Sequence, residues 1–275
     1  MSSPVMPQHG INSAGVVFLH GWCGHGDEAD HLRSFLPERL LAPSWMPAPG
    51  SIDLADWPQA PGAAMDAAMA QVADGVLQRV RLAIVEAGFA GSLLIGHSMG
   101  GAMACLLAAD PEIAAQGLVL LDSSVPMPSQ RRADTLQRMG GWIACAAQDG
   151  RIAAQAAWAD DQPARTAHFF NLQDQGPRRR LIERRMAYAP VVEAAAVLGG
   201  YVQWLTDVAL QQVRCPVLAF AADPARLPVA EFREARPDAV VHTTTGCGHF
   251  QHVFAPECIG TQLVHFIETG CCGQA

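Results

Sequence analysis

Residue types suited to nucleophilic catalysis occur in a short motif, Gly96-His97-Ser98-Met99-Gly100. The motif follows the apolar residues 92–95 and precedes a run of helix-forming residues, 102–109. A serine flanked by glycines at a strand-to-helix turn is typical of a nucleophile elbow, in which a strained backbone exposes the hydroxyl at the end of a parallel sheet. We therefore predict that Ser98 is a nucleophile.

A serine hydroxyl needs a general base, and the base needs a group that orients it. His249 is the candidate base, because it lies in a glycine-containing loop after the last predicted strand and follows the serine in the chain. His97, by contrast, is expected to point away from the site. Two acids can orient His249: Asp122 and Asp223 each follow a predicted strand, and either strand end can bring a carboxylate close.

Two backbone amides are expected to stabilise the negative charge that develops on an attacked carbonyl oxygen. The Met99 amide directly follows the nucleophile at a predicted helix N-terminus, where the helix dipole adds a favourable potential. The Trp22 amide lies in the turn after the first predicted strand. The Trp22 indole is also expected to form part of the substrate-binding wall.

The elements that position these residues are predicted from short apolar segments separated by helical patterns. Segments that are apolar throughout suit a parallel sheet covered by helices on both faces. Helices are predicted over residues 65–86 and 256–268. The predicted strands are residues 15–19, 39–42, 92–95, 117–121, 216–220 and 239–242. This order predicts an α/β fold with a mostly parallel sheet flanked by helices.

A long interruption separates the fourth and fifth predicted strands. Residues 126–210 contain only helical patterns, and we predict that they form a helical lid inserted into an α/β core of residues 1–125 and 211–275. Aromatic and methionine side chains in this segment favour an apolar or aromatic substrate group, although none is assigned individually. The helices predicted within it are residues 129–148, 151–159, 163–170, 177–188 and 191–205.

Composition limits the function classes. Half of the 275 residues are apolar, which allows a large core, and the net charge of −8 argues against nucleic acid or an anionic membrane as partner. The arginines in residues 178–185 are expected to form a solvated helix face. Eight cysteines without a CxxC pair, including Cys271 and Cys272, indicate a reducing compartment. No signal peptide or membrane-spanning run is evident, which predicts a soluble cytoplasmic protein.

Three motifs taken together resemble the α/β-hydrolase superfamily: His20-Gly21-Trp22, residues 96–101 and Gly248-His249-Phe250. The resemblance covers nearly the whole chain. Most similar members carry the acid after the penultimate strand in a glycine-containing turn, but the corresponding turn before Asp223 has no glycine. Some members place the acid after the strand that precedes the lid, which is the position of Asp122. We take Asp122 as the acid and keep Asp223 as the alternate.

The predicted function is hydrolysis of a carboxylic ester, or of a related small acyl compound, through an acyl-enzyme. No metal or organic cofactor is expected, because neither a ligand cluster nor a dinucleotide motif is present. Three alternatives remain open. The first is a cofactor-independent ring-cleaving dioxygenase, although Met99 stands where those enzymes typically have a second histidine. The second is a C–C or amide hydrolase, and the third a ligand receptor on the same scaffold. The oligomeric state is not predicted.

Overall fold

A computed structural model describes residues 15–270, so the N-terminal 14 residues and the Cys271-Cys272 pair lie outside the described part. Six strands form a single sheet in the order β2-β1-β3-β4-β5-β6, and every neighbouring pair is parallel. This arrangement confirms the predicted fold class. The strands are β1 (Val16–Leu19), β2 (Leu40–Leu41), β3 (Leu93–His97), β4 (Gly117–Leu121), β5 (Val217–Ala221) and β6 (Val240–Thr243).

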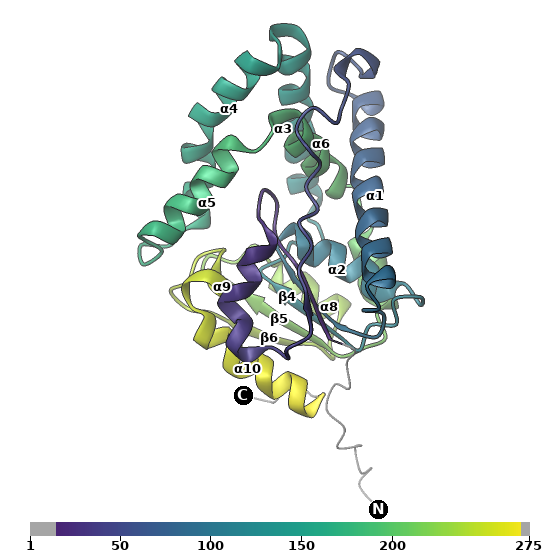
Figure 1. Cartoon of the computed structure of the whole chain (residues 1–275), viewed down its shortest axis with the longest axis vertical. Helices are drawn as coiled ribbons and strands as arrows, with labels where there is room; N and C mark the ends of the chain where they lie inside the picture. The colour runs from purple at the N-terminus through teal and green to yellow at the C-terminus, as the bar shows by residue number, and fades with distance from the viewer. Residues whose placement is uncertain (1–14, 271–275) are drawn as a thin grey trace, which may run out of the picture.

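Alternate strand residues face opposite sides of the sheet, and both sides are covered by helices (Figure 1). Val16 and Phe18 pack with η1 (Gly26–Phe35) and α10 (Pro256–Thr269) on one face. Val17 and Leu19 belong to the core on the other face. Burial on both sides explains why the central strands are rich in apolar residues. The helices of the second face are α1 (Ala63–Glu86), α2 (Met99–Ala109), α7 (Thr206–Gln212) and α8 (Val229–Ala235).

The chain between β4 and β5 contains helices and no strand, and the helices within residues 129–201 lie above the sheet in Figure 1. One prediction within it was wrong: residues 151–170 were expected to form two helices divided at Pro163, but α4 continues to Thr166. Pro163 lies inside α4, three residues before its last residue, and the helix continues through it although proline has no backbone N–H to donate. The elements are α3 (Ser129–Asp149), α4 (Arg151–Thr166), η3 (Ala167–Phe169), α5 (Pro177–Tyr188), α6 (Val191–Tyr201) and α7.

Helix α1 joins this helical insertion to the sheet. Met65 and Met69, in its first half, belong to a core shared with α3, α4 and α6. Val76 and Val80, in its second half, belong to the core on the sheet. The long α1 therefore runs beside both parts, as Figure 1 shows. The division into a lid of residues 126–210 and a separate core remains a prediction.

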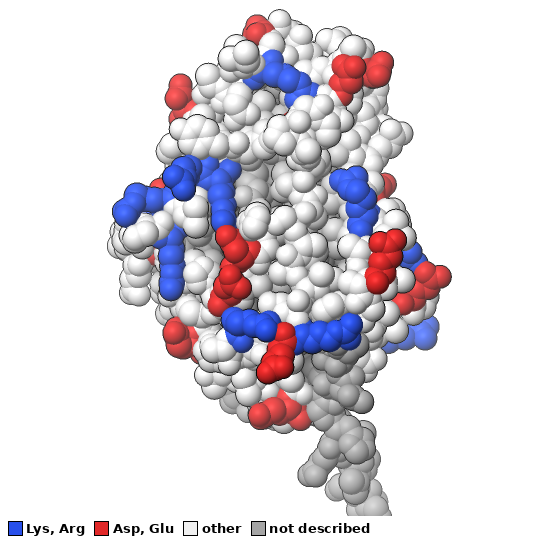
Figure 2. All heavy atoms as spheres, in the orientation of Figure 1, with Lys and Arg blue, Asp and Glu red and all other residues white. Residues whose placement is uncertain are grey.

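The arginines of α5 lie on the surface in Figure 2, and two of them fasten the helix to the rest of the protein. Arg185 forms an ion pair with Asp27 in η1, and Arg178 donates to the carbonyl of Val253 in α9 (Gln251–Phe254). Arg180 is exposed. Within residues 15–270, the cysteines are free thiols, and no helix combines the length and apolarity needed to cross a bilayer.

Candidate active site

Ser98 occupies the turn between β3 and α2, as the motif predicts. Its backbone has φ 52° and ψ −119°, a combination that is strained for a residue with a side chain. The Ser98 amide donates to the carbonyl of Leu121 at 3.0 Å, which ties the turn to the end of β4. The Ser98 side chain is half-buried, and it lines a cavity described below. The local backbone therefore presents the hydroxyl rather than packing it away.

Close backbone packing explains the two glycines of the motif. A Cβ atom at Gly96 would overlap the backbone of Gly100 and Gly101 in the first turn of α2. A Cβ atom at Gly100 would overlap the carbonyl oxygens of Leu19 and His20 at the end of β1. Both positions require a residue without a side chain because β1, β3 and α2 approach each other here.

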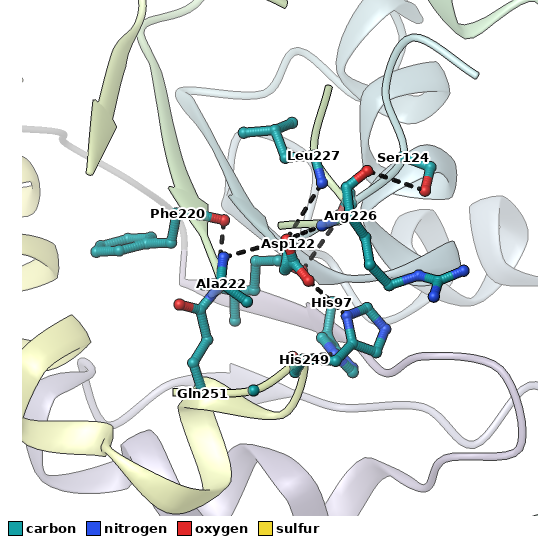
Figure 3. Close-up of polar contacts among 12 residues, drawn as sticks. His97, Asp122, Ser124, Phe220, Ala222, Arg226, Leu227, His249 and Gln251 are labelled. Atoms are coloured by element: carbon teal, nitrogen blue, oxygen red, sulfur yellow. Dashed lines mark hydrogen bonds and ion pairs between the residues drawn. The ribbon is translucent and has the colours of Figure 1, made fainter. Parts of the chain in front are cut away.

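His249 and Asp122 point toward each other (Figure 3). His249 Nδ1 lies 2.7 Å from Asp122 Oδ2, and both side chains are buried. An ionised carboxylate only accepts hydrogen bonds, so Nδ1 carries the proton and donates it. The other ring nitrogen, Nε2, then has a free lone pair. This is the tautomer that a general base requires.

The second oxygen of Asp122 is held by the loop after β5. Asp122 Oδ1 accepts hydrogen bonds from the backbone amides of Ala222 at 3.2 Å, Arg226 at 2.8 Å and Leu227 at 3.2 Å. Burial raises the pKa of Asp122, but the hydrogen bond and charge of His249, together with these amides, outweigh burial and lower it overall. Asp122 itself has φ 45°, so strained backbone occurs at both strand ends that carry the site.

Asp223 lies elsewhere. Its side chain is exposed, and its Oδ2 accepts a hydrogen bond from the amide of Gly246 at 3.4 Å. Its backbone amide donates to the carbonyl of Cys247 at 2.9 Å. Asp223 therefore supports the loop that precedes His249, while the carboxylate that the structure brings to the imidazole is that of Asp122.

The surroundings of His249 fix its position. The His249 amide donates to the carbonyl of Phe169 at 2.7 Å, and the Phe169 ring lies over the imidazole at a centroid distance of 5.0 Å. Burial lowers the pKa of His249 below its ordinary value, although the hydrogen bond and charge of Asp122 oppose this effect. The imidazole is therefore neutral at pH 7. Within residues 15–270, no hydrogen bond links it to the Ser98 hydroxyl.

His97 was predicted to point away from the site, and its side chain does not line the cavity that Ser98 lines. His97 Nε2 lies 3.0 Å from the carbonyl oxygen of His249, so the imidazole supports the loop that carries the base. His97 also contacts a buried pair in which His252 Nε2 lies 3.3 Å from Glu28 Oε2.

Within the described part of the chain, one group of ionisable residues has a geometry that could hold a metal ion. It consists of Glu28, His97 and His252. Their ligand atoms lie within 4.8 Å of one another, and all three side chains are buried. Glu28 is paired with His252, whereas Nδ1 of His97 and Nδ1 of His252 are buried without a hydrogen-bond partner among the described residues. The expectation of no metal remains a prediction.

Ser98, Met99 and Trp22 line one cavity of about 780 Å³ between the sheet and the helical insertion. Met99 is the first residue of α2, so its amide has no acceptor within the helix. The Trp22 indole is fixed by a hydrogen bond from Nε1 to the carbonyl of Ala194 at 2.9 Å. The cavity volume is in the range of small-molecule sites in proteins.

The sequence analysis missed the charged part of this cavity. Four arginines line the cavity: Arg131, Arg138, Arg165 and Arg226. Of the aromatic and methionine side chains in residues 126–210, the cavity wall includes Met139, Phe169 and Tyr201. Other members of that set lie elsewhere: Trp158 is buried in the core of the insertion, and Tyr188 is 73% exposed. The arginines come from three separate segments, so no local pattern in the sequence could have revealed their convergence.

The comparisons with known proteins agree with this architecture. MenH from S. aureus has 17% identity and a TM-score of 0.64, with 93% of each chain covered. A haloalkane dehalogenase from Bradyrhizobium elkani has 19% identity and a TM-score of 0.67, covering 93% of this chain and 90% of its own. A thermophilic esterase from Thermogutta terrifontis has 17% identity and a TM-score of 0.62, covering 93% and 89%.

At these identities the solved structures support the fold alone. The search of curated proteins gave no match. A family model described as "Alpha/beta hydrolase family" matches residues 16–258, which include every strand and each of the site residues described above. The chain therefore belongs to the alpha/beta hydrolase family.

Proposed function

We propose that the protein hydrolyses a carboxylic ester, or a related small acyl compound, with Ser98 as nucleophile, His249 as general base and Asp122 as the acid that orients the base. The observation that carries the proposal is the buried hydrogen bond of 2.7 Å between His249 and Asp122, close to the strained turn that exposes Ser98. Acyl transfer needs a nucleophile, a base and a carboxylate that orients the base. The three residues lie at strand ends or in the loops that follow them.

In the first half-reaction, Ser98 Oγ forms a bond to the carbonyl carbon while its proton moves to Nε2 of His249. The carbonyl π electrons move onto oxygen and then return, so that the bond to the leaving alcohol breaks. His249 gives its proton to that alcohol. In the second half-reaction, a water loses a proton to His249 and its oxygen forms a bond to the acyl carbon. The bond between that carbon and Ser98 Oγ then breaks, the protonated imidazole returns the proton to Oγ, and the carboxylic acid leaves.

The negative oxygen formed in each half-reaction needs fixed donors. We assign this role to the backbone amides of Met99 and Trp22. The position of Met99 at the start of α2 supports its assignment, because that amide has no helical acceptor and the helix dipole favours an anion there. The presence of both residues in the wall of the cavity with Ser98 supports their joint use.

Hydrolysis of a 4-nitrophenyl ester series from acetate to palmitate tests the proposal. Wild type is expected to release 4-nitrophenolate with a preferred chain length, and Ser98→Ala is expected to lose this activity. Ser34→Ala is the matched control, because Ser34 is exposed in η1 on the opposite face of the sheet. Equal turnover by wild type and Ser98→Ala would disprove the proposed role of Ser98.

A further inference from the structure

The cavity at Ser98 has a charge opposite in sign to that of the whole protein. The chain has a net charge of −8, and all 18 of its basic residues are arginines. Four arginines line the cavity, whereas Asp134 is the single acidic residue in its wall within residues 15–270. An excess of cationic side chains in a partly enclosed site favours anionic ligands.

Two of these charged groups are already engaged. Arg165 forms an ion pair with Asp161, one helical turn away, and its guanidinium lies over the Trp142 ring at 5.0 Å. Asp134 accepts a hydrogen bond from the Gln130 side chain at 2.8 Å. Gln130 is neutral, so Asp134 keeps its negative charge. Arg131, Arg138 and Arg226 nevertheless outnumber this carboxylate in the described wall of the cavity.

Arg131 and Arg226 lie together, and neither guanidinium forms an ion pair within the described part of the chain. Arg131 Nη1 donates to the carbonyl of Arg226 at 3.0 Å and to the hydroxyl of Ser124. Arg226 Nη1 lies 2.8 Å from His168 Nε2, and its guanidinium lies over the Phe169 ring at 4.7 Å. Burial, followed by the charge of Arg131, lowers the pKa of Arg226, and the charges of Tyr201 and Asp122 oppose this effect only in part.

Arg138 completes the cationic wall. Arg131 and Arg138 are seven residues apart on α3, so they lie on one face of the helix, two turns apart, with Thr135 between them. Within residues 15–270, Arg138 forms neither an ion pair nor a hydrogen bond. Its guanidinium is therefore available to a ligand without first breaking a contact inside the protein.

We propose that the substrate of this site carries an oxyanion, a carboxylate or a phosphate, on the part of the molecule remote from the ester, and that Arg138, Arg131 and Arg226 bind it. The inference deepens the proposed function and rests on it, because it names the substrate class for the same site. Guanidinium groups bind both oxyanions through parallel hydrogen bonds. A charged anchor beyond the scissile bond would fix the carbonyl at Ser98.

A pair of esters of nearly equal length tests the inference. Mono-4-nitrophenyl adipate ends in a free carboxylate, whereas 4-nitrophenyl methyl adipate ends in a neutral methyl ester. For wild type at low ionic strength, we expect kcat/KM for the free acid to exceed that for the methyl ester by about tenfold, which is the scale of one charge-assisted hydrogen bond. Added salt should reduce the difference.

Variants locate the effect. Arg138→Gln is expected to bring the ratio of the two kcat/KM values close to one, chiefly by raising KM for the free acid. Arg138→Lys keeps the charge and should restore part of the preference. Arg180→Gln is the matched control, because Arg180 is exposed on α5 and does not line the cavity. It should leave the ratio unchanged.

Inhibition of methyl ester hydrolysis distinguishes the two oxyanions. Competitive inhibition by butyrate identifies a carboxylate site, stronger inhibition by butyl phosphate identifies a phosphate site, and neutral butyramide should not inhibit. The inference would be overturned if wild type hydrolysed both esters with similar kcat/KM values and neither anion inhibited it. If this hydrolysis still required Ser98, the proposed function would stand. Hydrolysis that persists in Ser98→Ala would instead overturn the proposed function on which the inference rests.

Discussion

Asp122 Oδ2 accepts a hydrogen bond from His249 Nδ1 at 2.7 Å, although the two residues are 127 positions apart in the chain. Asp122 follows β4, the strand beside the one that carries Ser98, and His249 lies in the loop after β6. The loop after β5 passes between them in sequence and supplies the amides that hold the other carboxylate oxygen. The pair is therefore assembled by three adjacent strands of the sheet.

Replacing Asp122 by asparagine should impair the proposed base. An asparagine side chain can present an amide N–H to Nδ1, which would favour the tautomer with the proton on Nε2 and remove the lone pair needed for proton transfer. We expect kcat/KM for a 4-nitrophenyl ester to fall by about 10³-fold to 10⁴-fold. Steady-state kinetics on the folded variant, verified by circular dichroism, measures the loss.

Asp223→Asn is the comparison for that experiment. The Asp223 side chain is exposed and contacts the Gly246 amide rather than the imidazole, so activity should remain near the wild-type value. If Asp223→Asn lost as much activity as Asp122→Asn, the assignment of Asp122 as the acid that orients His249 would be contradicted.

The pH dependence of kcat/KM reports the base. Ester hydrolysis needs neutral His249, and burial lowers the pKa of this group below its ordinary value. Activity should therefore increase with pH through a midpoint below about 6.5, the ordinary value for histidine, and stay constant above it. Asp122 opposes the lowering, so Asp122→Asn should move the midpoint of its residual activity to still lower pH. A wild-type midpoint above the ordinary histidine value would contradict this account.

The local motifs were sufficient to predict the fold and the position of Ser98. Gly96 lies against the start of α2, and Gly100 lies against the end of β1, so neither position has room for a side chain. Helix α2 follows the turn directly in the sequence, and β1 is the neighbour of β3 in the sheet. The apolar strands indicated a parallel sheet because the four central strands, β1, β3, β4 and β5, are buried on both faces. These features depend on short segments, and the structure confirms the predicted fold class.

The distribution of charges could not be predicted in the same way. Whether Asp122 or Asp223 reaches His249 depends on the path of the loop after β5, which turns its amides toward Asp122. The arginines that the sequence made conspicuous lie on α5, whereas Arg138 and Arg226 reach the cavity from distant segments. Such convergence is a property of the packed chain and not of any window of its sequence.

The close packing of the turn predicts a difference between two glycines. Gly100→Ala places a methyl group against the carbonyl oxygens of Leu19 and His20, and we expect it to lower the free energy of unfolding by about 1–3 kcal/mol. Gly141→Ala is the matched change, because Gly141 lies within α3 and nothing is within 4 Å of the added carbon. That variant should gain about 0.5–1 kcal/mol from helix propensity. Urea denaturation measures both, and equal effects would refute the packing argument.

The most direct test of the central claim is covalent labelling of the nucleophile. A fluorophosphonate reagent should react with the intact protein, and mass spectrometry of its peptides should place a single adduct on Ser98. The Ser98→Ala variant should remain unlabelled, and His249→Ala should react far more slowly because the hydroxyl then lacks its base. An adduct on another residue, or equal labelling of Ser98→Ala and wild type, would contradict the proposed mechanism.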